Sequence, residues 1–229
     1  MKIILLTVTI ALAGVCTANA QTSLDGSIGT SNQDKVSLNL ALRKQFSEKF
    51  RAGIELQTSS VRYRFIGAKV IDEGLSTTLS FPFSIRFYEY QKLRLDFYSR
   101  VGVRFQGIDK NLATEKVLKD NTSVGLHLEP GLQVSLAFSE KINLQSGVTL
   151  PNLFELKPQF IFENNITNIF ANVGYQLSQK SILMLKVNAG PAAGASGDSQ
   201  KFNWSLQAGL RFALNKNQKS LSPQLDPTF

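Results

Sequence analysis

Apolar and polar residues alternate with a period of two along most of this chain. The pattern is clearest over residues 75–107, where two long alternating arms flank a short connection at residues 89–92. In the first arm the odd positions from Leu75 to Phe87 are apolar except for Thr77, and the even positions are Ser, Thr, Pro or Arg. A period of two is expected of a strand with two unlike faces. Each arm exceeds the roughly 9–11 residues that a tilted strand needs to cross a bilayer.

Shorter stretches of the same alternation lie on both sides of this hairpin. They predict strands over residues 22–30, 36–46, 50–65, 124–138, 142–150, 169–177, 183–189 and 201–214. The first is weak, and in the third the phase slips near Ser59 and Ser60, where a β-bulge would restore the two faces. Residues 151–167 are ambiguous, because Phe154 and Leu156 also fit an extended hairpin above the membrane. The pattern predicts about ten strands, or about eight if the weak strand and one hairpin are misread.

The connections between the predicted strands are alternately short and long. Short turns fall near residues 47, 89, 139 and 178, and longer connections follow residues 65, 107, 150 and 190. Short periplasmic turns, long external loops and an even strand number are typical of bacterial outer-membrane barrels. We therefore predict an all-β fold, an antiparallel up-and-down transmembrane β-barrel over residues 21–214, located in the cell outer membrane.

A soluble secreted β-barrel is the alternative fold, because its strands alternate as well. Three features of the sequence favour the membrane. The polar face is rich in Ser, Thr, Gly, Asn, Gln and Arg rather than in Lys and Glu, and the apolar face is too bulky for a small closed interior. Aromatic residues also gather near both ends of the strands, as two girdles at the membrane interfaces would. A closed sheet suits lipid because it leaves no backbone group unpaired.

The two ends of the chain differ from its alternating middle. Residues 1–20 combine a basic start, an apolar stretch and the small residues Ala18 and Ala20, which together predict a signal peptide cleaved after Ala20. Cys16 stands in a sequence similar to a lipobox, but Val15 occupies the position that needs a small residue. The mature chain then has no cysteine and no disulfide. Residues 215–229 are predicted to form a polar C-terminal tail.

The chain is basic, with a formal net charge of +8. A basic balance is compatible with nucleic acid or with an anionic membrane. Because the chain is predicted to be exported and has no Lys/Arg-rich run, we expect no nucleic-acid partner. Outer-membrane lipid and lipopolysaccharide are the expected partners, and the sequence does not identify a protein or surface partner outside the cell.

The chain resembles the small outer-membrane β-barrel proteins of Gram-negative bacteria, the OmpA/OmpX-like and outer membrane protein beta-barrel domain group. The resemblance covers the architecture of nearly the whole mature chain and, locally, residues 207–214. There Gln207, Gly209, Phe212 and Leu214 match the polar-x-Gly-x-x-aromatic-x-hydrophobic pattern of the β-signal. This match implies that the barrel assembly machinery is a partner during biogenesis. In many members the signal ends the chain, whereas here a tail follows.

His127 is the only histidine, and it lies on the polar face of its strand, two residues before Glu129. One hypothesis is an outer-membrane lipid-modifying enzyme or protease that uses this histidine. No Ser or Asp is linked to His127 by a recognisable motif, which favours a lumen histidine bonded to polar neighbours. With one histidine and no mature cysteine, no metal site is predicted. We predict no catalytic residue and no cofactor.

If the apolar faces meet lipid, the charged residues of the polar faces line the lumen. This predicted lumen charge cluster comprises Arg43, Arg51, Glu55, Arg62, Arg64, Arg86, Arg94, Asp96, Arg100, Arg104, His127, Glu129, Lys186 and Arg211. Salt bridges and hydrogen bonds are expected to fill so small a lumen. The function predicted is therefore a structural or interaction protein with external loops and a plugged lumen. The alternative is a narrow small-solute pore that favours anions, because cations outnumber carboxylates in the cluster.

Overall fold

The computed structural model describes residues 21–31, 34–64, 71–111, 122–157, 161–164, 167–192 and 201–214. The predicted signal peptide with Ala18 and Ala20, the predicted tail and parts of the predicted long loops lie outside these residues. No helix within the described ranges is long and apolar enough to cross a membrane.

The described residues form strands joined by turns. The strands are β1 (Thr22–Ser31), β2 (Asp34–Gln45), β3 (Phe50–Arg64), β4 (Ile71–Tyr90), β5 (Leu93–Asn111), β6 (Thr122–Ala137), β7 (Ile142–Thr149), β8 (Asn152–Lys157), β9 (Ile161–Asn164), β10 (Asn168–Ser178), β11 (Ser181–Ala192) and β12 (Lys201–Ala213). β4 and β5, which form the hairpin with the clearest alternation, are the longest, with 20 and 19 residues.

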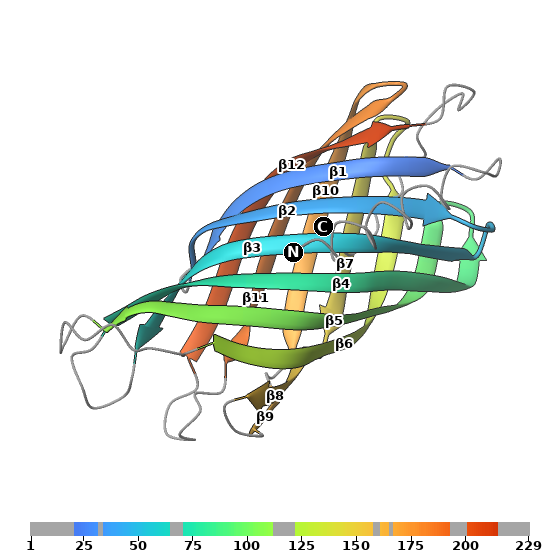
Figure 1. Ribbon diagram of the computed structural model, residues 1–229. Helices are drawn as coiled ribbons and strands as arrows, with labels where there is room; N and C mark the ends of the chain where they lie inside the picture. Colours follow the sequence, from blue (N-terminus) through green and yellow to red (C-terminus); the bar gives the residue numbers. More distant parts are fainter. Residues whose placement is uncertain are drawn as a thin grey trace.

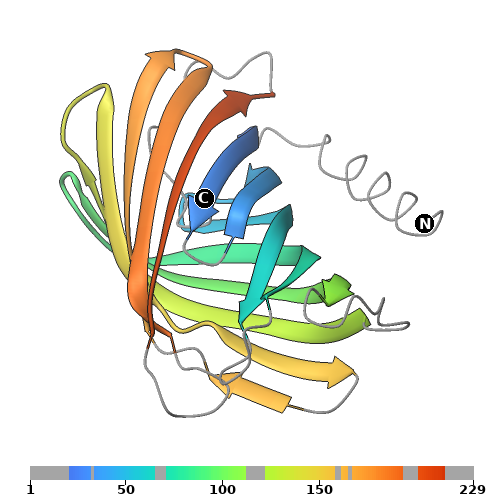
Figure 2. The ribbon, with the colours of Figure 1, turned by 90° about the vertical axis from the view of Figure 1, so that its left-hand side faces the viewer.

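Ten of these strands close into an antiparallel barrel (Figures 1 and 2). β1 to β7 pair with their neighbours in chain order, β7 pairs with β10, and β10 to β12 continue in order. β12 then pairs with β1 and completes the ring. The predicted up-and-down barrel of about ten strands is confirmed, and the alternative of eight strands is wrong.

β8 and β9 extend one hairpin beyond the ring. β6 pairs with β7 from Gly131 onward, but with β8 over the part that ends at Leu128. β8 pairs in turn with β9. β8 follows β7 after a break at Leu150 and Pro151, and β9 precedes β10, so the β8–β9 hairpin extends the β7–β10 pair. The ambiguous stretch over residues 151–167 is thus partly strand and extends the hairpin as its apolar positions suggested.

The outer surface of the barrel is apolar and the inner surface is polar. Leu40 of β2 and Phe81 of β4 are each 53% exposed on the outside, whereas Asp25 of β1 and Glu55 of β3 are 3% and 1% exposed inside. A soluble barrel would place these faces the other way round, because water would cover its outer side. The soluble alternative is therefore wrong, and the broad apolar surface is the one expected to meet lipid.

Three of the short turns share one local structure. The Ser47 hydroxyl accepts hydrogen bonds from the backbone N–H groups two and three residues later, at 3.3 and 3.0 Å. Ser139 repeats both distances, and Ser178 accepts one such bond at 3.2 Å. The fourth turn instead uses Gln91 at a positive φ of 51°. We call this rim the short-turn end, and the opposite rim the long-loop end.

Two strand details differ from the prediction. The irregularity expected near Ser59 and Ser60 belongs to the facing strand, where the register with β3 shifts between Asp34 and Ser37 of β2. The long loop expected over residues 108–123 is shorter, because β5 continues to Asn111 and β6 begins at Thr122. The polar residues at the end of β5 do not end the strand, because β5 stays paired with β4 as far as Asn111, whose partner is Asp72.

Candidate functional site: the barrel lumen

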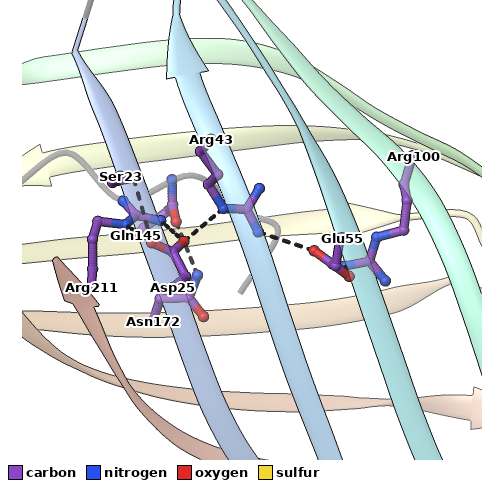
Figure 3. Close-up of polar contacts among 8 residues, drawn as sticks. All are labelled: Ser23, Asp25, Arg43, Glu55, Arg100, Gln145, Asn172 and Arg211. Carbon is purple, nitrogen blue, oxygen red and sulfur yellow. Dashed lines mark hydrogen bonds and ion pairs between the residues drawn. The ribbon is translucent and has the colours of Figure 1, made fainter. Parts of the chain in front are cut away.

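A chain of ion pairs passes through the lumen along five strands (Figure 3). Arg211 of β12 binds Asp25 of β1, and Arg43 of β2 donates to the same carboxylate through Nε at 2.7 Å. The Nη2 of Arg43 is 3.0 Å from Glu55 Oε2 on β3, and Arg100 of β5 reaches Glu55 Oε1 at 3.3 Å. Each carboxylate thus lies between two guanidinium groups, which compensates charges that would be costly to bury alone.

Strand register explains why these side chains meet. Ala41 of β2 is the direct partner of both Asp25 and Glu55, and Ser80 of β4 is the next partner of Glu55. Ser80 pairs in turn with Gly102 of β5. The small residues leave the long arginines room to extend across their positions. At Gly102 the strands approach closely, since an added Cβ would lie 2.6 Å from the Leu79 carbonyl oxygen.

A second network of uncharged amides fills the lumen nearer the short-turn end. Gln133 donates to Asp96 at 2.8 Å, and Gln145 donates to Gln133 at 2.5 Å and to Ser135 at 3.1 Å. Asn172 of β10 donates to Gln145 at 2.9 Å. These side chains come from β5, β6, β7 and β10, so the network shares β5 with the ion-pair chain and extends to three strands that the chain does not reach.

At the short-turn end a carboxylate holds two arginines. Glu89 lies beside the β4–β5 turn, outside the apolar band, and is 2.6 Å from Arg94 Nε and 3.1 Å from Arg86 Nη1. The hydrogen bond from Arg94 is the main reason that the pKa of the Glu89 carboxyl lies below its usual value. Arg86 also lies 3.4 Å from Asp96 and joins this group to the amide network.

Toward the long-loop end, the lumen wall carries a further polar group on β5 and β6. Arg100 is the direct register partner of Glu129, with Nη1 3.4 Å from Oε2. His127 is the partner of Gly102, and its Nε2 lies 3.9 Å from the same carboxylate. Arg104 lies one layer further toward the long-loop end, opposite Gly125.

Several interior side chains toward the short-turn end are enclosed. Tyr98 of β5 is 1% exposed, and Ile182 and Met184, which follow the turn at the start of β11, are 0% and 1% exposed. A side chain that lined a water-filled channel would be reached by solvent from the lumen, and these three are not. In the ion-pair chain the side chains of Arg43 and Glu55 are 5% and 1% exposed, whereas that of Arg100 is 12% exposed.

The predicted lumen cluster maps onto the structure as follows. Eight members are buried inside the barrel, namely Arg43, Arg51, Glu55, Arg86, Asp96, Glu129, Lys186 and Arg211. Arg94, Arg100, Arg104 and His127 are partly buried. Arg62 and Arg64 belong to β3, but their side chains lie outside the described part of the structure.

Several interior residues were not included in the predicted cluster. Asp25 is the most important, because two arginines depend on it, and it was missed because the first strand has few apolar positions. Tyr98, Gln133, Gln145 and Asn172 were missed because only charged residues were considered. The available signal was that Tyr98 lies two residues after Asp96, and that the other three lie on the polar faces of their own strands.

The β-signal residues lie on β12, or directly after it, next to the seam with β1. Phe212 and Leu214 are 45% and 49% exposed on the outer surface. The Leu214 N–H donates to the Thr22 carbonyl at 2.9 Å and extends the seam. Gln207 has the opposite orientation and faces the lumen, where Gly29 accommodates its side chain: a Cβ at Gly29 would lie 2.5 Å from Gln207 Cγ.

Catalytic and metal-binding groups are not evident in the described ranges. His127 has no hydrogen bond with a Ser, Thr or Asp side chain there, and its nearest charged partner is Glu129. No group of three or more His, Cys, Asp or Glu residues within those ranges could hold a metal ion.

Solved structures with a similar fold are outer-membrane proteins. The beta domain of the Bordetella autotransporter BrkA matches with a TM-score of 0.50 and 12% identity, over 85% of this chain and 99% of that one. An outer membrane channel from Pseudomonas putida F1 matches at 0.49 and 10%, over 86% and 97% of the two chains. The NanC porin matches at 0.46 and 12%, over 82% and 98%. No family model and no curated protein matches the sequence.

A closed antiparallel barrel with an apolar outside and a charged inside defines a transmembrane β-barrel of the bacterial outer-membrane type. The chain accordingly has the fold of a transmembrane β-barrel, which it shares with the beta domain of the Bordetella autotransporter.

Proposed function

We propose that the protein is a structural or interaction barrel, a lipid-embedded scaffold with a closed lumen whose long-loop end meets surfaces or proteins. The observation that carries this proposal is the buried ion-pair chain from Arg211 through Asp25, Arg43 and Glu55 to Arg100. A permanent pore needs a solvated passage, and buried ion pairs within the lumen support a filled interior instead.

Energy favours the closed lumen. An open passage would separate Glu55 from Arg43 or Arg100, and water would have to replace each lost ion pair. A scaffold needs no such opening.

Planar-bilayer recording of the purified barrel tests the proposal. We expect no conductance steps from wild-type protein that migrates in unheated SDS gels as a folded barrel. That gel shift controls for insertion of unfolded chains. Regular steps from folded wild-type protein would contradict the closed scaffold.

A second candidate function is a narrow anion-favouring pore. It is supported by the partial exposure of Arg100, Arg104 and His127 toward the long-loop end. The same recording under a salt gradient distinguishes it, because a cationic lining would shift the reversal potential toward that of chloride.

The proposal also assigns partners to the outer surface. Outer-membrane lipid and lipopolysaccharide would cover the apolar band, and the barrel assembly machinery would read β12. Phe212→Ala should then lower the amount of barrel assembled in cells while leaving refolding in detergent unchanged. Trp204→Ala on the same outward face is the matched control. Equal losses for both variants would argue against a β-signal at Phe212.

A further inference from the structure

Arg104 is a lumen cation with no counter-ion in the described structure. It lies on β5 opposite Gly125 of β6. No described carboxylate lies within ion-pair distance of Arg104, and its Nε is enclosed without a hydrogen-bond partner. Arg100, one layer closer to the short-turn end, is instead held by Glu55 and Glu129. The unpaired Nε requires an explanation, because an enclosed donor without a hydrogen-bond partner is uncommon in folded proteins.

Two further nitrogen atoms near Arg104 lack a hydrogen-bond partner. His127 is the register partner of Gly102, so it lies between the levels of Arg100 and Arg104 on the adjacent strand. Such diagonal neighbours are about 7–8 Å apart at the backbone, within reach of long side chains. His127 interacts electrostatically with both arginines. The Nδ1 of His127 and the Nε of Arg100 are also enclosed without a partner, and an imidazole Nδ1 can carry the proton of a donor.

The side chains of this group are partly accessible to solvent. Those of His127 and Arg100 are 19% and 12% exposed, although both face the interior of the barrel. Tyr98 and Glu55 are only 1% exposed. A small solute that enters the lumen can therefore reach His127 and Arg100 but not Tyr98 or Glu55.

We propose that Arg104, His127 and Arg100 form a binding site for a small oxyanion, the carboxylate or phosphate group of a small solute. A guanidinium group donates two parallel charge-assisted hydrogen bonds to either group, so Arg104 supplies the principal contact. The negative charge of Glu129 does not exclude an anion from the site, because Arg100 already neutralises that charge. This inference goes beyond the scaffold function, because a closed lumen needs no ligand.

Titration of the purified full-length barrel in detergent with inorganic phosphate tests the site. Calorimetry should detect one site on wild-type protein, and Arg104→Gln should weaken phosphate binding about tenfold or more, as expected for the loss of a charge-assisted hydrogen bond. Arg94→Gln is the matched control, because Arg94 lies at the other end of the barrel and already pairs with Glu89. Its phosphate affinity should equal that of wild type.

A parallel titration with acetate distinguishes the two ligand chemistries. Tighter binding of phosphate supports a phosphoryl solute, tighter binding of acetate supports a carboxylate, and both should depend on Arg104. The site is refuted if wild-type protein binds neither anion at millimolar concentration, or if Arg104→Gln binds phosphate as tightly as wild type. Gel migration without heating verifies that each variant is folded. Conductance plays no part in this test, so failure of the site leaves the closed scaffold intact.

Discussion

Asp25 and Arg211 join the first and last strands of the barrel by a two-pronged ion pair. Arg211 Nε lies 2.7 Å from Asp25 Oδ1, and Arg211 Nη2 lies 2.6 Å from Oδ2. The two residues are direct register partners across the β1–β12 seam, although they are 186 positions apart in the chain. A bidentate pair adds geometric specificity to its charge, so this pair helps to select the register in which the barrel closes.

Asp25→Asn should destabilise the barrel by about 3 kcal/mol or more, because it removes the charge of the buried carboxylate that Arg211 and Arg43 both bind. Urea unfolding in lipid vesicles, followed by fluorescence of the single tryptophan Trp204, measures the change. Glu89→Gln is the control: the Glu89 side chain is 43% exposed, and an exposed pair contributes at most about 1 kcal/mol. A loss below 1 kcal/mol for Asp25→Asn would mean that the seam does not depend on this pair.

The alternation of the sequence was sufficient to predict the barrel and its faces. Leu40 and Glu55 lie on opposite sides because their strands alternate regularly, and lipid outside requires polar groups inside. The ion-pair partners of the lumen charges were harder to predict from the sequence. Arg100 and Glu129 lie on strands that follow one another in the chain, whereas Asp25 meets Arg211 only after the ring has closed. A contact of that kind depends on the register of every strand between them.

Local irregularities limited the prediction in another way. The phase slip near Ser59 and Ser60 of β3 predicted an irregularity there, but the register shift lies in the facing strand β2, between Asp34 and Ser37. A slip of phase in one strand can be absorbed by its neighbour, because a bulge changes the pairing of both. The pattern of one strand therefore locates a bulge only to a pair of strands.

Tyr98→Ala should open a passage through the lumen. Tyr98 is the register partner of Ser84 and Gly131, two small residues, and it occupies the space in front of them. Its removal connects the solvent-accessible part of the lumen near Arg100 with the short-turn end. In planar bilayers we expect conductance steps from Tyr98→Ala and none from Tyr98→Phe, which keeps the ring. Silent recordings from folded Tyr98→Ala would place the seal at the ion-pair chain instead.

Gly147→Ala should cost about 1–3 kcal/mol, as expected for overpacking. A Cβ there would lie 2.5 Å from the Phe170 ring and would also contact the Leu132 carbonyl. Gly26→Ala is the matched control on β1, since nothing lies within 4 Å of its Cβ position, and removing a strand glycine should stabilise by up to about 1 kcal/mol. Urea midpoints should move in opposite directions, and a shift of the same sign in both variants would contradict the packing assigned to Gly147.

Leu40→Arg should destabilise the barrel in lipid by about 2–4 kcal/mol, because an outward charge near the centre of the apolar band must leave water for hydrocarbon. Leu177→Arg is the control. Leu177 is also outward and exposed, at 54%, but it is next to the last residue of β10, Ser178, beside a turn. A charge there can reach the interface and should cost at most about 1 kcal/mol. Unfolding free energies of both variants in vesicles measure this dependence on depth. Equal costs at the two positions would mean that lipid does not cover the apolar outer surface of the barrel.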